Sequence, residues 1–444
     1  MTRSVVKINS NVIVVVGVIA AGLVLIASLG SKFRPLNVSC QGTTAINVAG
    51  GLVSGGTADF GATSGRRFQM KRVRDFEKDK RVGYRPPSTC TDYHKKPPAT
   101  PCKKWVVITT IFEPSELVKQ LSEITSWCVV VVADKKGPEK YVVPNVKYLS
   151  VLEQESCQFH ICKLLIWNHF GRKNIGYMYA IHHGAEYIYD TDDDNVLRRA
   201  KIPDPAKIKG VKNINMKGTV WNPYPMMSKY PDSWPRGFPL EKIKSKEAKT
   251  QSFTDELPLG KIGIIQSLAD NEPDVDAIYR FTQPLPFDFH HKELYVAVPQ
   301  GVMTPYNAQA TMTMYDAFFS TYLPVTVKGR VSDIWRSYFN VRLFWYIERS
   351  LVFSAPWVVQ YRNAHNWLAD FDSENDLYMR AAQLVEYLTN WKSSEKDIAS
   401  MSIELYKEMY NHQVLQIDDV YNIEAWFKDL ECLGYKFPAI VSKE

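Results

Sequence analysis

The chain has 444 residues, of which 45% are hydrophobic and 12% aromatic, and its formal net charge at pH 7 is +7. This composition excludes a chain that is disordered throughout, because there is enough apolar side chain to bury a sizeable core. The length fits one large domain with appendages. Basic residues crowd the segment 66–104, where a solvated tether is the expected use of such a composition. The net charge therefore does not indicate nucleic-acid binding.

The first feature along the chain is an apolar run from Val12 to Leu29, with basic residues on both sides of it. A run of this length can cross a bilayer as a helix. A cleaved signal peptide is the alternative, but its apolar region usually spans about 7–15 residues. We therefore predict a cytosolic tail over 1–11, a transmembrane signal anchor over 12–29 and a luminal location for the rest of the chain.

The region 30–102 is rich in Gly, Ser, Thr, Pro and basic residues without periodicity, which predicts a luminal stem. Asn37 begins an Asn-Val-Ser triplet, an N-glycosylation acceptor if it meets the lumen. All seven cysteines follow the apolar run, and a secretory lumen permits disulfide bonds. An odd number leaves one cysteine over, and Cys128, inside the apolar stretch 127–133, is expected to be a buried free thiol.

From residue 103 onward the sequence alternates between strand and helix patterns. A buried strand is predicted over 105–110, a helix over 116–125 and a second strand over 127–133. Parallel strands joined by a helix imply an α/β sheet that is covered on both faces. Ligands in such sheets bind beyond the carboxyl ends of the strands, and Asp134 stands at that edge.

A second unit follows the same plan and ends in acidic residues. Its helix is predicted over 173–183 and closes at Gly184, a favourable residue for a helix end. The strand 187–189 follows and runs directly into four aspartates. These are Asp190, Asp192, Asp193 and Asp194.

Four carboxylates within five residues repel one another, so a fold that gathers them normally offsets their charge with a cation. Hard oxygen ligands select magnesium, manganese or calcium. A solvated acidic turn is the alternative, but the apolar strand before the aspartates favours a metal site. A calcium loop that starts at Asp190 would need Gly and Glu where the chain has Asn195 and Lys201, so this kind of site is excluded.

A divalent ion held by an Asp-x-Asp pair suits a nucleoside diphosphate leaving group, because it bridges two phosphates and neutralises the charge that develops on them. Arg172 and Lys173 begin the helix that leads to the aspartates. A helix N-terminus also favours phosphate, so both residues are candidates for the diphosphate site. A solvent-facing helix start is the alternative.

The run Arg172–Ala185, followed by Tyr189–Asp193, resembles the STELLO family of glycosyltransferases. Further similar segments are Asn222–Tyr224, Trp234–Glu241, Asp274–Ala277, Pro299–Gly301 and Ser332–Trp345. The resemblance covers roughly 104–438. It implies an α/β fold with a GT-A-like, Rossmann-like nucleotide-sugar-binding domain over 103–350 and a mostly helical C-terminal extension over 351–444. It also implies a single-pass type II protein of the Golgi membrane, with this domain in the lumen.

On this resemblance, Asp190 and Asp192 are the expected Asp-x-Asp pair for Mn²⁺ or Mg²⁺, with Asp193 and Asp194 as further metal ligands. Asp333 is the candidate base that takes the proton of the acceptor hydroxyl, and a salt bridge to Arg330 or Arg336 is its alternative role. The residues expected to contact the donor nucleotide are Thr109, Thr110, Asp134, Arg172, Lys173 and Asp190.

The predicted function is metal-dependent transfer of a sugar from a nucleotide-sugar donor to a glycan or protein acceptor. One alternative is a transferase-like scaffold that binds partner Golgi membrane enzymes, and another is a metal phosphoesterase that needs no acceptor sugar. Four histidines have no ligand spacing with the aspartates and are predicted to be structural. They are His160, His169, His182 and His183.

Overall fold

The computed structural model describes residues 5–7, 13–19, 22–26, 70–95, 101–249 and 252–441. By its internal contacts the chain divides into two compact units, Met1–Gly65 and Arg66–Glu444, and each is described by itself. The predicted glycosylation triplet at Asn37 and the seventh cysteine, Cys40, lie outside the described residues.

The first unit contains a small antiparallel sheet of β1 (Val5–Lys7), β2 (Ile13–Ile19) and β3 (Gly22–Ile26). Two of these strands occupy the run over 12–29 in which the sequence predicts a transmembrane helix. The described residues include no helix with both the length and the apolar character needed to cross a membrane, so the predicted helix is not supported. The run is rich in Val and Ile, and β-branched residues suit an extended strand as well as an apolar helix.

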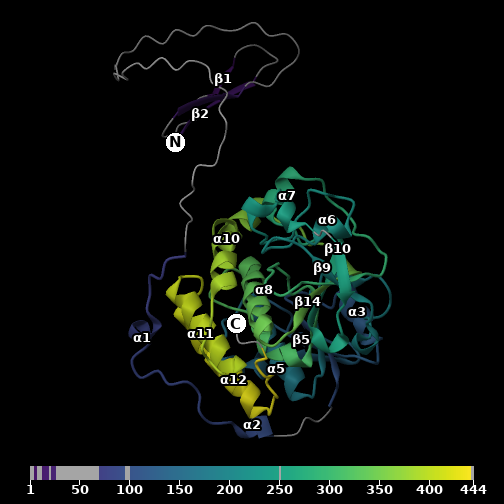
Figure 1. Ribbon diagram of the computed structural model, residues 1–444, viewed down its shortest axis with the longest axis vertical. Coiled ribbons are helices and arrows are strands. Elements are labelled where there is room, and N and C mark those ends of the chain that lie inside the picture. Colours follow the sequence, from purple (N-terminus) through teal and green to yellow (C-terminus); the bar gives the residue numbers. More distant parts are fainter. Residues whose placement is uncertain are drawn as a thin grey trace. The chain divides into compact units, whose positions relative to one another are not determined.

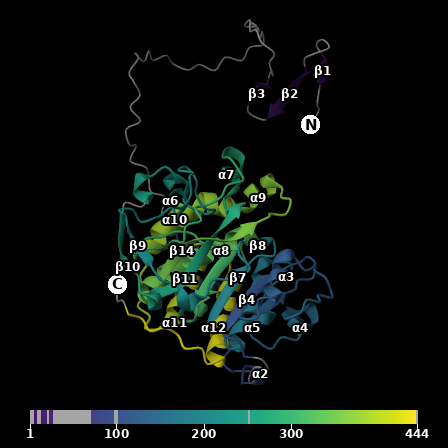
Figure 2. The same cartoon turned by 90° about the vertical axis from the view of Figure 1, so that its right-hand side faces the viewer.

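One large mixed sheet organises the second unit, and four parallel strands form one side of it (Figure 2). In spatial order they are β6 (Val146–Leu149), β5 (Cys128–Val132), β4 (Lys104–Thr109) and β7 (Tyr187–Thr191). The strands predicted over 105–110, 127–133 and 187–189 are therefore confirmed. Their Val- and Ile-rich runs reflect burial on both faces of a parallel sheet.

Beyond β7 the sheet changes direction. Strand β13 (Ala310–Met314) is antiparallel to both of its neighbours, β7 and β11 (Ile262–Asn271), and β11 is parallel to β14 (Ser350–Gln360). The remaining strands are β12 (Tyr295–Ala297), β9 (Val211–Asn215), β10 (Ser252–Glu256) and β8 (Asn195–Leu197), the last of which pairs with β14. The architecture is α/β with a mixed sheet, compatible with a Rossmann-like fold.

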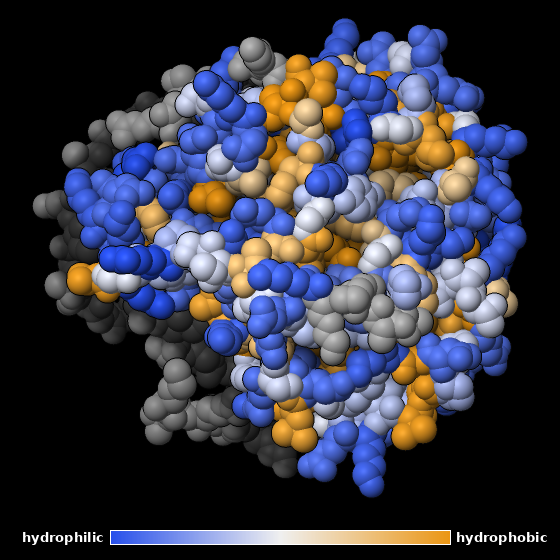
Figure 3. All heavy atoms as spheres, turned by 90° about the horizontal axis from the view of Figure 1, so that it is seen from below, coloured by the Kyte–Doolittle hydropathy of each residue, from blue (hydrophilic) through white to orange (hydrophobic). Residues whose placement is uncertain are grey.

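Helices cover both faces of the sheet, as the alternating strand side chains require. Val107 of β4 belongs to a large apolar core with α5 (Lys173–His182) and α8 (Gly329–Tyr346), whereas Val106 belongs to a second core with α3 (Glu116–Ser122). The helices that follow β14 are α9 (Trp367–Ser373), α10 (Asn375–Asn390), α11 (Ile398–Asn411) and α12 (Ile417–Cys432). The first three contact α8, and α12 packs on α11 (Figure 1). Hydrophilic residues cover much of the face seen in Figure 3, with apolar patches between them.

Residues 70–95, predicted to be part of a stem, lie against the C-terminal helices. They include the short helices α1 (Phe76–Asp79) and α2 (Asp92–Lys95). Phe76 is buried against the rings of Tyr410 and Tyr421. This segment is therefore part of the folded unit.

The described residues contain three disulfide bonds, Cys90–Cys432, Cys102–Cys128 and Cys157–Cys162. The prediction of a free thiol at Cys128 is wrong. Cys102 lies just before β4, and β4 pairs in register with β5, so Cys102 comes beside Cys128 at the start of that strand. Sequence periodicity shows the buried strand but not the cysteine beside it.

Gly176 lets α5 lie close to the sheet, and this contact is testable. A Cβ atom at Gly176 would lie 2.6 Å from Cγ1 of Val107 and 2.8 Å from Cγ2 of Val132. We expect Gly176→Ala to lower the free energy of unfolding by about 1–3 kcal/mol, because the strands must move to admit the methyl group. Denaturant unfolding measures this change. Gly260→Ala is the control, since no atom lies within 4 Å of its added Cβ; equal effects of the two substitutions would contradict the close packing.

Candidate functional site

The strand order reverses its direction between β4 and β7. The chain leaves β4 for β5 and β6 on one side, and it returns to β7 on the other side of β4. Such a reversal opens a ligand crevice at the carboxyl ends of the two central strands. Thr109 and Thr110 lie at the end of β4, and the aspartates lie at the end of β7 and just beyond it. The structure therefore brings these predicted residues to one edge.

Asp190, however, is deeply buried on β7. The ammonium group of Lys173 donates to Oδ1 of Asp190 at 2.7 Å, and the hydroxyl group of Tyr177 donates to Oδ2. Arg336, from α8, lies 3.8 Å from the same carboxylate. This aspartate is therefore enclosed by protein groups, a placement that the sequence pattern alone does not distinguish from that of its neighbours.

Lys173 is fully buried and connects several elements. Besides Asp190, it donates to Oδ1 of Asp192 at 3.0 Å, to the carbonyl oxygen of Thr191 at 3.0 Å and to that of Ala308 at 3.1 Å. Burial lowers the pKa of this ammonium group, but the two carboxylates outweigh burial and keep its pKa above the ordinary value. Lys173 is thus a charged anchor beneath the aspartates.

The next three aspartates form the loop after β7, and each side chain is partly exposed. Asp192 shares Lys173 with Asp190. Asp193 accepts a hydrogen bond from the hydroxyl group of Thr110, which fastens the loop to the end of β4. Asp194 accepts a bond from the amide of Gln360 on Oδ2 at 3.0 Å, while its buried Oδ1 has no hydrogen-bond partner among the described residues.

An amide network holds the far end of this loop. The side-chain amide of Asn195 donates to the hydroxyl oxygen of Thr191 at 3.1 Å and to the carbonyl oxygen of Gln309 at 3.2 Å. Gln309 returns a bond to Oδ1 of Asn195 at 2.9 Å. The loop is therefore fixed at both ends, by Thr110 at Asp193 and by Gln309 at Asn195.

Two carboxylates of the loop have raised pKa values. Burial, together with the charge of Asp192, raises the pKa of Asp194 to about 6. Burial is also the largest cause of the raised pKa of Asp193, and Asp192 adds to it. A divalent cation would relieve both effects, and the unpartnered oxygen of Asp194 is a free ligand atom. The residues present therefore fit a hard metal ion held by Asp192 and Asp194.

Asp134 and Arg172 lie near one another below the crevice. The carboxylate of Asp134 accepts backbone hydrogen bonds from Asn168 at 2.8 Å and from His169 at 3.1 Å. The buried guanidinium group of Arg172 donates to the side-chain oxygen of Gln154 and stacks on Trp167 at 3.7 Å. Both side chains thus support the loop that precedes α5, where the sequence predicts contacts with a nucleotide.

Asp333 is buried on α8 and forms an ion pair. The guanidinium group of Arg236 donates to its two oxygens at 3.1 and 3.0 Å and also pairs with Asp274 at 2.7 and 3.0 Å. Burial raises the pKa of Asp274, but Arg236 outweighs it and holds that pKa at about 2. The structure therefore shows the salt bridge considered for Asp333, with Arg236 as the partner instead of an arginine on α8.

Two site residues have no signal in the sequence. Gln360 and Arg362, at the end of β14, approach Asp194 from 166 and 168 residues along the chain. Arg362 lowers the pKa of Asp194 by its charge, and its own pKa falls to about 10 because it is buried and lies near other arginines. Only the pairing of β8 with β14 brings these residues to the loop.

The chain is similar to known proteins over most of its length. Residues 330–444 match the family model described as STELLO glycosyltransferases. The chain is 30% identical over 359 residues to "Probable glycosyltransferase STELLO2" of Arabidopsis thaliana and 28% identical over 361 residues to "Probable glycosyltransferase STELLO1" of the same organism. Each match covers 77% of this chain and 46% of the relative, so the chain spans about half the length of the curated relatives it matches.

The buried pair below the loop predicts a large effect on stability. Lys173→Met leaves Asp190 without its nearest cation, so we expect the free energy of unfolding to fall by about 3–5 kcal/mol. Adding Asp190→Asn to this variant should restore part of the loss, because the uncompensated charge disappears. Denaturant unfolding of the unmodified chain, of each single variant and of the double variant measures the coupling free energy between Lys173 and Asp190. The exposed pair Lys103–Glu186 is the control, and Lys103→Met should leave the free energy of unfolding nearly unchanged, because solvent screens this pair. Similar losses in the free energy of unfolding for Lys103→Met and Lys173→Met would contradict the role of Lys173 as a buried anchor.

Proposed function

Because the chain belongs to the STELLO family of glycosyltransferases, we propose that it transfers a sugar from a nucleotide-sugar donor bound at the carboxyl ends of β4 and β7. The observation that carries this proposal is the aspartate loop. Asp192 and Asp194 lie just beyond the carboxyl end of β7, where burial and the charge of Asp192 raise the pKa of Asp194. One buried oxygen of Asp194 has no hydrogen-bond partner among the described residues. These features suit a metal-bound diphosphate.

In this proposal Asp192 and Asp194 hold Mn²⁺ or Mg²⁺. A divalent ion held there would offset the negative charge that develops on the leaving nucleotide. Asp193 has a different task, since its bond to Thr110 sets the position of the loop. Asp190 belongs to the buried anchor. The proposed metal pair therefore lies two residues later in the chain than the pair that the sequence suggests.

Groups around the loop are suited to the rest of the donor. Ile111 and Phe112 come just after Thr110, and these residues are 41% and 51% exposed. An exposed aromatic ring beside a crevice suits the face of a nucleobase, so we place the nucleoside next to Thr109 and Thr110. Arg362 supplies positive charge on the other side of Asp194, where it favours the phosphates. The donor thus spans the loop from β4 toward β14.

We also propose that this domain lies in the Golgi lumen, with the protein attached to the membrane as a type II protein. The three disulfide bonds support an oxidising compartment, because the cytosol keeps most thiols reduced. The acceptor is a glycan or a protein.

One observation favours the scaffold alternative. Asp333 is held on both oxygens by Arg236, so it is not poised to take a proton from an acceptor hydroxyl. A scaffold that binds partner membrane enzymes would retain the donor crevice without a base. Donor binding without turnover on any glycan acceptor is the result that would select it.

Donor binding by the full-length chain tests the proposal. We expect at least one nucleotide sugar from a panel to bind in the presence of Mn²⁺ and not in the presence of chelator, as measured by calorimetry. Asp192→Asn and Asp194→Asn should each weaken binding by about tenfold or more, because each removes a charged ligand contact.

Asp255→Asn is the matched control, since Asp255 is exposed on β10 at the edge of the sheet. Its donor affinity should equal that of the unmodified chain. Absence of metal-dependent binding for every donor would sink the proposal, and so would equal affinities for all three variants.

A further inference from the structure

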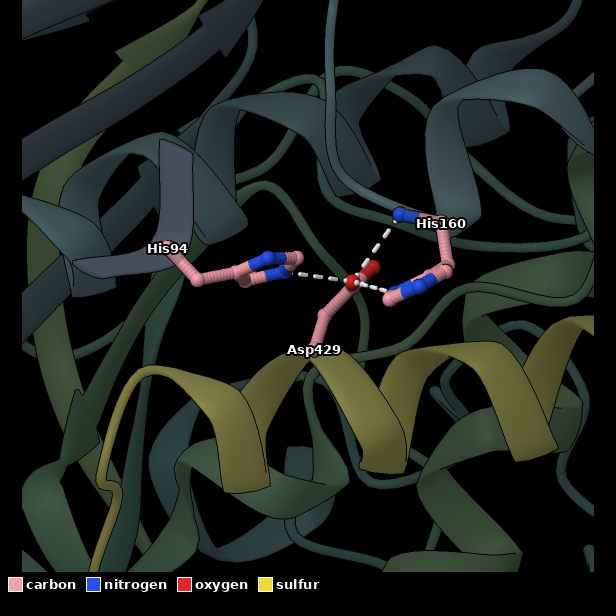
Figure 4. Close-up of side chains that lie close together, drawn as sticks. All are labelled: His94, His160 and Asp429. Carbon is pink, nitrogen blue, oxygen red and sulfur yellow. Dashed lines mark hydrogen bonds and ion pairs between the residues drawn. The ribbon is translucent and has the colours of Figure 1, made fainter. Parts of the chain in front are cut away.

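A second group of potential ligands lies outside the aspartate loop. His94 of α2, His160 and Asp429 of α12 point toward one another from three separate segments (Figure 4). One atom from each residue lies within 4.8 Å of the other two. Among the described residues, no other set of three His, Cys, Asp or Glu side chains meets in this way.

The carboxylate of Asp429 is the centre of the group. Its Oδ1 lies 2.8 Å from Nε2 of His94 and 2.6 Å from Nδ1 of His160. The backbone N–H groups of His160 and Ile161 also donate to this carboxylate, each at 2.9 Å. Burial raises the pKa of Asp429, but these hydrogen bonds outweigh it and leave the pKa below the ordinary value. A fully buried, ionised carboxylate thus faces two imidazole rings.

A further residue orients the ring of His94. Nδ1 of His94 lies 2.7 Å from the hydroxyl oxygen of Thr91, which can donate its own hydrogen to the carbonyl oxygen of Gln158. The backbone N–H of Thr91 also donates to Nδ1 at 3.1 Å, so Nδ1 accepts and Nε2 carries the proton that it donates to Oδ1 of Asp429. A metal bound in place of the Nε2 proton would leave Nδ1 as the protonated nitrogen, 2.7 Å from the hydroxyl oxygen of Thr91, and a metal-ligating histidine normally donates its other ring N–H to such an oxygen.

The surroundings hold the three segments in place. The disulfide Cys90–Cys432 joins the chain just before α2 to the end of α12, and Cys157–Cys162 brackets His160. These four cysteines are used up in disulfides, so the ligands available here are nitrogen and oxygen atoms. The side chain of His160 is 18% exposed, which leaves one side of the group open to solvent.

From this geometry we propose a zinc site whose ligands are Nε2 of His94, Nδ1 of His160 and a carboxylate oxygen of Asp429. Two imidazoles and one carboxylate form a recognised zinc ligand set, with water in the fourth, solvent-facing position. Ring nitrogens select Zn²⁺ over Mg²⁺, which prefers oxygen ligands. The site is structural: it fastens α12 to α2 and to the segment that begins at His160. It is independent of the donor crevice and of the proposed transferase activity.

Metal analysis of the full-length chain tests this site. After treatment with a chelator, the protein is equilibrated with Zn²⁺ in excess Mg²⁺, which occupies the oxygen ligands of the aspartate loop. We expect about one zinc per chain and, with Co²⁺ instead, visible absorption bands of a four-coordinate ion. Removal of zinc should lower the melting temperature of the chain.

His160→Ala and Asp429→Asn should each weaken zinc binding at least about 100-fold, since each removes a direct ligand. Asp429→Asn keeps the shape of the side chain, and circular dichroism establishes that both variants are folded. The exposed His290→Ala is the matched control and should bind zinc like the unmodified chain. If the unmodified chain binds no zinc, or if both ligand variants bind it normally, the group is only a hydrogen-bonded cluster and the proposal is overturned.

Discussion

The buried ammonium group of Lys173 is the interaction on which the site depends. It joins the start of α5 to the end of β7 through Asp190, and to the chain before β13 through Ala308. Burying one charge alone would cost several kcal/mol, so the ammonium and the carboxylate must stay together. Ala308 also donates its N–H to Asp333, where the second buried pair begins. Ala308 thus contacts both buried ion pairs, Lys173–Asp190 through its carbonyl oxygen and Arg236–Asp333 through its N–H. Together these pairs form the buried support beneath the aspartate loop.

The aspartates differ in burial: Asp190 is enclosed beside Lys173, whereas those of the loop are partly exposed. Residues 190 and 192 lie on the same side of an extended chain, and both reach Lys173. Asp190 lies inside the strand and is enclosed, whereas Asp192 lies past its end and is partly exposed. The carboxylates available to a ligand are therefore those of the loop. Lys173 offsets part of their charge, and a divalent ion would offset the rest.

Local patterns were enough to predict β4, β5, β7, α5 and the edge at which the aspartates gather, because buried β-branched runs and the stop at Gly184 are local signals. They were not enough to tell which aspartates are buried and which are available to a metal ion. The burial of Asp190 depends on Arg336, which is distant in the sequence, and Gln360 reaches Asp194 through a strand pairing that no periodicity reveals. The apolar run over 12–29 shows the same limit, since its composition suits a helix or a strand.

The C-terminal part of the chain contributes residues to the site and support beneath it. It supplies β14 to the interior of the sheet, and α12 contacts the segment between β13 and α8. Asp419 of α12 accepts hydrogen bonds from the hydroxyl group of Tyr322 at 2.6 Å and from the N–H of Val325 at 2.8 Å. The neighbouring carbonyl of Thr321 accepts from Arg336, whose guanidinium group faces Asp190. Buried, directional contacts therefore connect α12 to the anchor of the aspartate loop.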